Sequence, residues 1–272
     1  MVQIMKANGH LVAFKKSNIE KTVLRAGGSR EFAKKIANKV SKKVHKGTTT
    51  RQILEITLKL LKKQPSIALR YDLKRAIMSL GPQGFTFEEY FSQLLQNYDY
   101  KTNVGLIMKG KATTHEVDVL AEKKKKYMIE CKYHNRLGTH TNSKVSMYTY
   151  ARFLDLHNNP KNKINHGWLV TNTKCTPHAR EYAKGVGLKL TSWNHATKGK
   201  KSLQELIDLK KLYPITILPS VEGDIKAGLT KAKIVLAKDI LTHSPQELRK
   251  KTGLKIKDLK KVLKEANEIC FT

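Results

Sequence analysis

Two runs that alternate apolar and polar residues constrain the centre of this chain most strongly, because their polar positions include carboxylates. The first run is His115-Glu-Val-Asp-Val-Leu-Ala121 and the second is Tyr127-Met-Ile-Glu-Cys-Lys-Tyr133. Strict alternation is typical of β-strands, and the basic stretch 123–126 between the runs is typical of a turn. The sequence therefore predicts a β-hairpin.

The predicted hairpin gathers three groups that suit phosphodiester chemistry. Successive strand side chains point to opposite faces, so Glu130 and Lys132 share one face, whereas Cys131 and its apolar neighbours face the core. Asp118 meets Glu130 across the hairpin if the register allows. Two such carboxylates can bind Mg²⁺, and Lys132 can orient an attacking water. The alternative is an exposed hairpin whose acid and lysine form only a solvated pair.

A helix expected after Gly84-Phe-Thr-Phe-Glu88 supplies another acid. Its apolar stripe consists of Phe87, Tyr90, Phe91, Leu94, Leu95 and Tyr98. Glu88 lies on the flank of this stripe and Glu89 on the far side, so we expect Glu88 to look toward the sheet. The alternative is that both are ordinary first-turn acids that complement the helix dipole.

The order of these segments, followed by residues 168–183 and 188–193, resembles the Mrr-like restriction endonucleases of the PD-(D/E)xK nuclease superfamily. The resemblance covers about residues 83 to 195 and implies an α/β nuclease domain over 83–200. It implies Asp118, Glu130 and the backbone carbonyl of Cys131 as ligands of Mg²⁺ or Mn²⁺. It also implies Lys132 and Glu88 as catalytic residues. Thr113-Thr-His-Glu116 stands where many relatives have a glycine-rich run, which leaves the subfamily open.

The net charge favours a polyanionic partner. The chain has 53 Lys and Arg against 22 Asp and Glu, a formal charge of +31. DNA phosphates would be neutralised by such a surface in a salt-dependent manner. A generally lysine-rich proteome is the alternative explanation. No apolar run approaches a membrane span, no signal peptide is visible and the cysteines are widely spaced, so we expect a reduced, cytoplasmic protein without a membrane partner.

Residues 1–82 are predicted to form a separate unit. Alternation from Val2, the Asn8-Gly9 pair and the return through Leu11 to Phe14 predict a hairpin. Ser17 is expected to cap a helix that ends at Gly27-Gly28. Further helices are predicted over 30–43, 50–63 and 68–80.

This unit resembles an ATP-cone, a nucleotide-sensing domain. The residues that carry the resemblance are Val2, Lys6, Asn8-Gly9, Phe14, Ile19, Gly47-Thr-Thr-Thr50 and Ala68-Leu-Arg-Tyr71. It implies that Val2, Lys6 and Thr50 contact ATP or dATP, an adenine nucleotide acting as effector. Ala7 and Asn18 depart from basic positions of the family. A cone kept only as a docking platform for protein or DNA is the alternative.

Residues 201–272 are predicted to be helical, with helices over 203–212, 225–237, 245–252 and 256–269. The run from Leu229 to Lys257 resembles tandem helix-hairpin-helix units, which grip the DNA backbone, although Lys231-Ala-Lys-Ile234 lacks the expected glycine. The lysines that would contact phosphates are Lys250, Lys251, Lys255 and Lys257. Simple packing of helices or formation of a homo-oligomer is the alternative.

Together these features predict a Mg²⁺-dependent DNA endonuclease with an Mrr-like restriction or defence role, controlled by adenine nucleotide. Two alternatives stay open. One is a structure-selective DNA repair nuclease, since the fold alone does not determine the substrate. The other is a catalytically inactive, nucleotide-responsive DNA-binding regulator.

Overall fold

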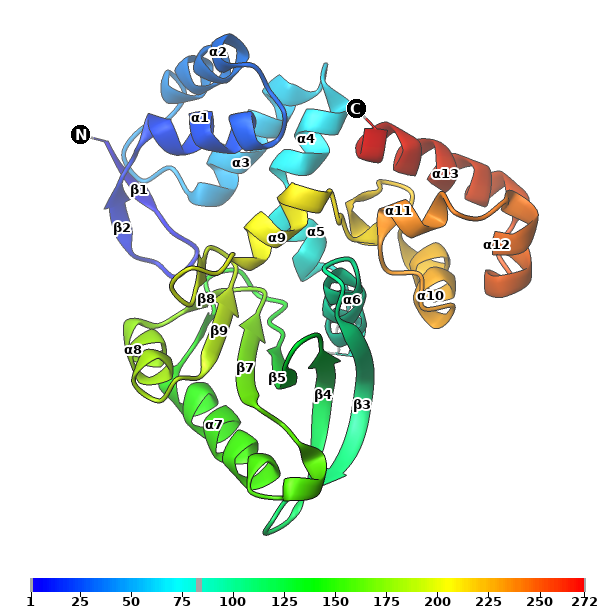
Figure 1. Cartoon of the computed structure of the whole chain (residues 1–272). Coiled ribbons are helices and arrows are strands. Elements are labelled where there is room, and N and C mark those ends of the chain that lie inside the picture. Colours follow the sequence, from blue (N-terminus) through cyan, green and yellow to red (C-terminus); the bar gives the residue numbers. More distant parts are fainter. Residues whose placement is uncertain (1, 82–84, 272) are drawn as a thin grey trace.

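A mixed β-sheet organises the middle part of the sequence and lies below α5 and α9 in the view of Figure 1. The computed structural model describes residues 2–81 and 85–271. Its largest sheet has the strand order β10-β9-β7-β5-β4-β3, antiparallel from β3 to β5 and parallel from β5 through β7 to β9. The strands are β3 (Lys101–Lys109), β4 (Thr114–Glu122), β5 (Lys126–Lys132), β7 (His166–Thr171), β9 (Lys189–Ser192) and β10 (His195–Ala196). The predicted hairpin is confirmed as β4 and β5, and the α/β fold class is confirmed.

Helices cover both faces of this sheet. Phe91 of α6 packs edge-on against Trp168 of β7 on one face, and Leu169 of β7 packs with α7 and α8 on the other. The elements are α6 (Phe85–Gln96), β6 (His140–Thr141), α7 (Ser143–His157), η1 (Pro160–Asn162), β8 (Lys174–Cys175) and α8 (Pro177–Gly185). Each face of the sheet therefore has its own apolar layer. The predicted Gly84 start of α6 lies outside the described residues.

The N-terminal unit is a hairpin followed by short helices. Its elements are β1 (Gln3–Met5), β2 (Leu11–Ala13), α1 (Lys16–Arg25), α2 (Arg30–Ser41), α3 (Thr50–Leu61), α4 (Pro65–Tyr71) and α5 (Leu73–Met78). The predicted hairpin is confirmed, because β1 and β2 pair and Gly9 has the positive φ of +81° that the turn requires.

Two local predictions in this unit were wrong. Ser17 does not cap α1, because the extended N-cap residue is Lys15, whose carbonyl accepts a hydrogen bond from the Asn18 amide. The helix predicted over 68–80 is two helices, since Asp72, with φ −92° and ψ 14°, departs from helical geometry between α4 and α5.

The C-terminal unit is helical, as predicted. Its elements are α9 (Leu203–Lys210), η2 (Ile215–Ile217), α10 (Gly223–Lys231), α11 (Ala237–Ile240), α12 (Pro245–Thr252) and α13 (Ile256–Phe271). The helix predicted over 225–237 was wrong beyond Lys231. Lys233 turns left-handed with φ +57°, and Leu236 then forms a β-bridge with Pro214. The helix over 245–252 is confirmed, and Gly253, with φ +72°, ends it.

Two main cores hold these elements together. One core packs β1 against the four helices α1, α2, α3 and α4. The other core is continuous from α5 and α6, across one face of the sheet, to the helices α10, α11, α12 and α13. Figure 1 shows α5 and α9 between the three regions. The predicted border at 82/83 lies outside the described residues, so the division into 1–82, 83–200 and 201–272 stays a prediction.

The three cysteines are free and buried, including Cys131 in the core as expected. Within the described part of the chain, no helix is long and apolar enough to cross a membrane.

Candidate nuclease site and its surroundings

Asp118 lies where the alternation of β4 is interrupted. Val119 packs into the core on the α6 side, whereas Val117, two residues earlier, packs into the cluster with Leu156 of α7. Gly105, which lies opposite Asp118 on β3, has a φ of +65°. Such local distortion re-aims a side chain and is frequent next to active sites. Simple strand alternation could not have predicted it.

The carboxylate of Asp118 reaches across the hairpin to β5. The pairing of β4 with β5 runs from Glu122 to Val119, and beyond it the Cys131 amide donates to Asp118 Oδ2 at 2.6 Å. Burial and, after it, the nearby Glu130 charge raise the pKa of Asp118 to about 6, against the opposing effects of the Cys131 amide and Arg152. Asp118 is therefore held beside Glu130, which the register allows.

Glu130 is 8% exposed and points to α7. Tyr148 donates to Glu130 Oε1 at 3.0 Å, and Arg152 donates to Oε2 at 2.5 Å. The Arg152 guanidinium also lies 5.7 Å from the Tyr148 ring centroid. Both oxygens of this acid thus have partners that hold it in place.

Glu88 joins the acids of the hairpin from the α6 side. Burial, followed by the charges of Asp118, Glu116 and Glu130, raises its pKa to about 7. Glu89 instead accepts a hydrogen bond from Gln93 at 2.9 Å, on the other side of the helix. The helical phase inferred from the sequence therefore places Glu88 correctly with the sheet acids.

We call Glu88, Glu116, Asp118 and Glu130 the carboxylate cluster. Its members come from α6, β4 and β5, and the mutual repulsion of their charges favours a bound cation. Carboxylate oxygens are the ligands that Mg²⁺ prefers, and Mg²⁺ usually keeps several waters. No ready-made group of three metal-ligating side chains occurs within residues 2–81 and 85–271. A hard cation at this cluster would therefore be bound by two carboxylates, with water and phosphate oxygens as its other ligands.

Lys132 lies at the end of β5, two residues after Glu130, and pairs in register with Thr171 of β7. It is half-buried, and its charge contributes to lowering the pKa of His134, after the larger effect of burial. The backbone carbonyl of Cys131 lies between Glu130 and Lys132, and its role as a metal ligand stays a prediction.

Three residues of this site are not among the catalytic or metal-binding residues predicted from the sequence. From the sequence, Glu116 either helps to shape the site or lies on the hairpin surface, and Tyr148 and Arg152 either pack in the core, which is favoured, or contact DNA. The spacing of Tyr148 and Arg152 by four places both on one face of α7, which was the available signal. Nothing local indicated that this face would meet Glu130.

The residues expected to bind nucleotide lie away from the carboxylate cluster. Lys6 and Thr50 line one cavity of about 270 Å³, whereas Val2 is 40% exposed and does not line it. The contact of Val2 with nucleotide stays a prediction, as do those of Lys6 and Thr50.

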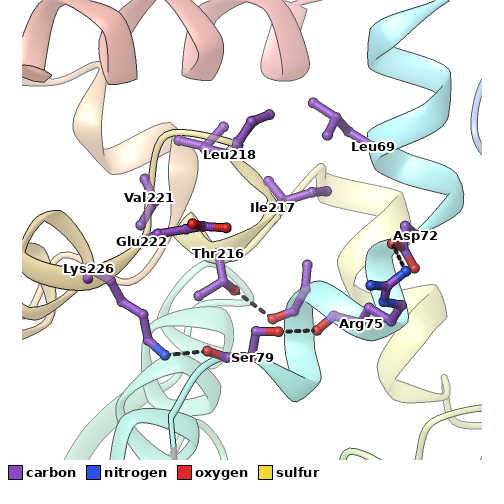
Figure 2. A pocket seen from close by; sticks show the side chains of 13 residues that line it. Leu69, Asp72, Arg75, Ser79, Thr216, Ile217, Leu218, Val221, Glu222 and Lys226 are labelled. Atoms are coloured by element: carbon purple, nitrogen blue, oxygen red, sulfur yellow. Dashed lines mark hydrogen bonds and ion pairs between the residues drawn. The ribbon is translucent and has the colours of Figure 1, made fainter. Parts of the chain in front are cut away.

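A larger cavity of about 460 Å³ lies between α5 and the segment from η2 to α10 (Figure 2). Several of its polar groups contact one another: Arg75 pairs with Asp72 at 3.3 Å, and Lys226 donates to the Ser79 carbonyl at 2.6 Å. Thr216 likewise donates to the Ala76 carbonyl at 2.6 Å. None of the site residues predicted from the sequence lines this cavity, which we interpret as a seam between packed regions.

Asp118 and Glu130 lie on a β-hairpin of a mixed sheet, and Lys132 follows Glu130 by two residues. This arrangement is typical of a restriction-endonuclease-like nuclease domain. Comparison with known families agrees, since residues 81–197 match a family described as restriction endonuclease. Residues 213–270 match a family described as AF1548-like, C-terminal.

A protein of Archaeoglobus fulgidus, named only as uncharacterized, is 37% identical over 179 residues, which is 65% of this chain and 98% of that protein. A solved structure, described as a protein of unknown function AF1548, has 35% identity and a TM-score of 0.61. The match covers 69% of this chain and 98% of that one. The chain belongs to this AF1548-like family, with a restriction-endonuclease domain followed by the AF1548-like C-terminal domain. Such a domain implies a hydrolase that acts on DNA.

Proposed function

We propose that this protein is a Mg²⁺-dependent DNA endonuclease whose active site is built on the β4–β5 hairpin. Asp118, Glu130 and the Cys131 carbonyl would bind the metal, with Mn²⁺ as a substitute, while Lys132 and Glu88 would act on the attacking water. The observation that carries the proposal is the carboxylate cluster, in which Glu88 meets the charges of Glu116, Asp118 and Glu130. Carboxylates crowded in this way, beside a lysine, need a cation to be ionised together.

The residues of the chain divide the work of hydrolysis. The Cys131 amide holds Asp118, and Tyr148 and Arg152 hold Glu130, so both carboxylates are positioned before substrate arrives. Lys132, on the same strand face as Glu130, would orient the attacking water toward the phosphate. When bound, Mg²⁺ supplies charge neutralisation at the phosphate and lowers the pKa of a bound water. Arg152, which contacts Glu130, would add positive charge to this site.

The C-terminal helices would extend the contact with DNA. Lys250, Lys251, Lys255 and Lys257 are exposed around the α12–α13 junction, where they could neutralise backbone phosphates. Their contacts would be independent of base sequence and would weaken as salt is added.

The N-terminal unit would control the nuclease through an adenine nucleotide. Its hairpin, helix starts and the positions of Lys6 and Thr50 in one cavity support an ATP-cone-like role. Phosphate is attracted by a lysine beside a helix N-terminus, and Thr50 is the first residue of α3. Val2 would contact the nucleotide from the start of the hairpin.

A restriction or defence role, on modified or foreign DNA, is the biological setting that the Mrr-like family favours. A structure-selective repair nuclease is the alternative within the same chemistry. An inactive DNA-binding regulator is the second candidate function, and the ion pair of Arg152 with Glu130 favours it, because the arginine occupies an oxygen that a metal would use.

Plasmid cleavage separates these functions. Wild-type protein and Asp118→Asn are incubated with modified, unmodified and branched DNA, with Mg²⁺ or EDTA and with or without ATP. We expect cleavage that requires both Mg²⁺ and Asp118, and the preferred substrate then distinguishes restriction from repair. DNA binding without metal-dependent cleavage on any substrate would establish the regulator instead.

A further inference from the structure

The cavity that Lys6 and Thr50 line is shared between two regions of the chain. The N-terminal side supplies Lys6, the turn residues after it, Thr50 and Lys74 of α5. The other side comes from the nuclease domain, through the loop 137–140 and Lys174 of β8. His140 and Lys174 are opposite each other in the parallel pair of β6 and β8. We call Lys6, Lys74, Lys174 and His140 the lysine pocket.

The lysine pocket concentrates positive charge without a counter-charge. Burial lowers the pKa of His140, and the charges of Lys174, Lys74 and Lys6 lower it further. The pKa of Lys74 is lowered first by burial and then by Lys174. Within residues 2–81 and 85–271, none of these lysines forms an ion pair with a carboxylate. Lys74 is partly buried, whereas Lys6, His140 and Lys174 are exposed at the rim of the pocket. Because these positive charges repel one another, a bound anion would stabilise them.

The N-terminal end of α3 adds to the positive electrostatic potential of the lysine pocket. Thr50 begins a helix of 12 residues, and Thr49 caps it with its side chain. The N-terminal end of a helix carries partial positive charge and free amide groups that favour anions. The lysines and the helix dipole therefore both favour the binding of an anion.

The two sides of the pocket touch closely. A side chain at Gly138, whose φ is +88°, would come within 3.3 Å of the backbone of Ala7 and Asn8 in the β1–β2 turn. The loop that carries Gly138 leaves β5 directly after Lys132. A ligand in the pocket would thus contact both the N-terminal hairpin and the loop that follows the candidate catalytic strand.

We propose that the lysine pocket binds the phosphate groups of a ligand and so joins the N-terminal unit to the nuclease domain through Lys174 and Lys74. The volume of about 270 Å³ suits a chain of phosphates better than a whole drug-sized molecule, so a base would lie outside. The phosphates come either from a free nucleoside triphosphate or from the DNA backbone. For the first source the proposal rests on the nucleotide control proposed above, but it does not require an active nuclease.

Binding measurements in EDTA test the pocket independently of cleavage. Calorimetry with the full chain measures affinity for ATP and for inorganic tripolyphosphate, and fluorescence anisotropy measures affinity for a short DNA duplex. Lys174→Gln should weaken binding of the phosphate source about tenfold, as expected for loss of one charge-assisted hydrogen bond. Lys174→Arg should restore most of the affinity, and Lys161→Gln, an exposed lysine outside the pocket, should have no effect.

Each outcome decides the proposal. Weaker binding of ATP and tripolyphosphate by Lys174→Gln assigns the pocket to a nucleotide, and weaker binding of the duplex alone assigns it to DNA. If Lys6→Gln weakens ATP binding while Lys174→Gln does not, the N-terminal unit binds nucleotide by itself and the shared site is overturned. Equal affinities of wild type and Lys174→Gln for all three probes overturn it as well. Melting curves of each variant check that the fold is retained.

Discussion

The carboxylate cluster and the lysine pocket are opposite in charge and lie at the two ends of one short segment. The first includes Glu130 on β5, and the second includes His140, which follows β5 through a single loop. The acids repel one another but have fixed partners, Tyr148, Arg152 and the Cys131 amide. Among the described residues the lysines form no ion pair with a carboxylate, although the Lys74 amine lies 5.9 Å from the Trp193 ring centroid. One site is therefore positioned in advance, whereas the other depends on a ligand to neutralise its charge.

The largest expected effect is a loss of cleavage, and it distinguishes catalysis by Lys132 from metal binding by the carboxylate cluster. Lys132→Met should reduce plasmid cleavage by about 10²–10⁴-fold, because a positioned group that acts on the attacking water contributes that much. Binding of Mg²⁺, followed as a rise in melting temperature, should persist in this variant. Asp118→Asn should lose both plasmid cleavage and the rise in melting temperature with Mg²⁺. Cleavage by Lys132→Met at the wild-type rate would remove the lysine from the mechanism.

Arg152→Ala tests whether the acids are held in advance. Glu130 is buried, so loss of its arginine should destabilise the metal-free protein by about 2–3 kcal/mol, below the full cost of an unpaired buried charge because Arg152 is partly exposed. Urea unfolding in EDTA measures this loss.

Mg²⁺ should recover part of the stability lost in Arg152→Ala, since the cation replaces the missing positive charge. Lys144→Ala on the exposed face of the same helix is the control. An unchanged unfolding midpoint for Arg152→Ala would show that the ion pair does not hold Glu130.

The pH dependence of the free energy of unfolding depends on the burial and mutual repulsion of the acids in the carboxylate cluster. Glu88 titrates at about 7 in the folded chain against an ordinary value of 4.5, so the folded state retains a proton that the unfolded state has lost. The free energy of unfolding should therefore fall as pH rises from 4.5 to about 7. Melting curves in EDTA at several pH values should show this fall, and Glu88→Gln should reduce it.

Saturating Mg²⁺ provides the matched comparison for this pH series. Because metal binds the deprotonated carboxylates, its stabilising effect should be larger above pH 7 than at pH 5. A metal effect independent of pH would mean that the acids of the cluster are not the ligands.

The smallest expected effect concerns the contact behind the lysine pocket. Gly138→Ala introduces a side chain at φ +88° against the backbone of Ala7, so it should cost about 1–2 kcal/mol and weaken tripolyphosphate binding a few-fold. Gly185→Ala, where nothing lies within 4 Å, is the control. Unfolding curves and calorimetry measure the two effects. Full affinity in Gly138→Ala would show that the pocket does not need this close contact.

The sequence alone determined the features that depend on short-range periodicity. Alternation around Asp118 and Glu130 predicted the hairpin, and the helical phase of α6 placed Glu88 with the sheet acids. Asn8-Gly9 predicted the N-terminal turn, and the helix predicted over 245–252 is α12. Each of these depends on residues within one or two turns or strand repeats, so local physics was sufficient.

Only the tertiary structure decided which groups surround these elements. The contacts of Tyr148 and Arg152 with Glu130 join residues 18 and 22 positions apart in the chain. The lysine pocket brings Lys6 together with Lys174, and α5 packs into a core with helices of the C-terminal unit. These juxtapositions follow from packing apolar faces against one another over long separations. Periodicity indicates that a face is apolar or charged, but the partner of that face is selected by the fold as a whole.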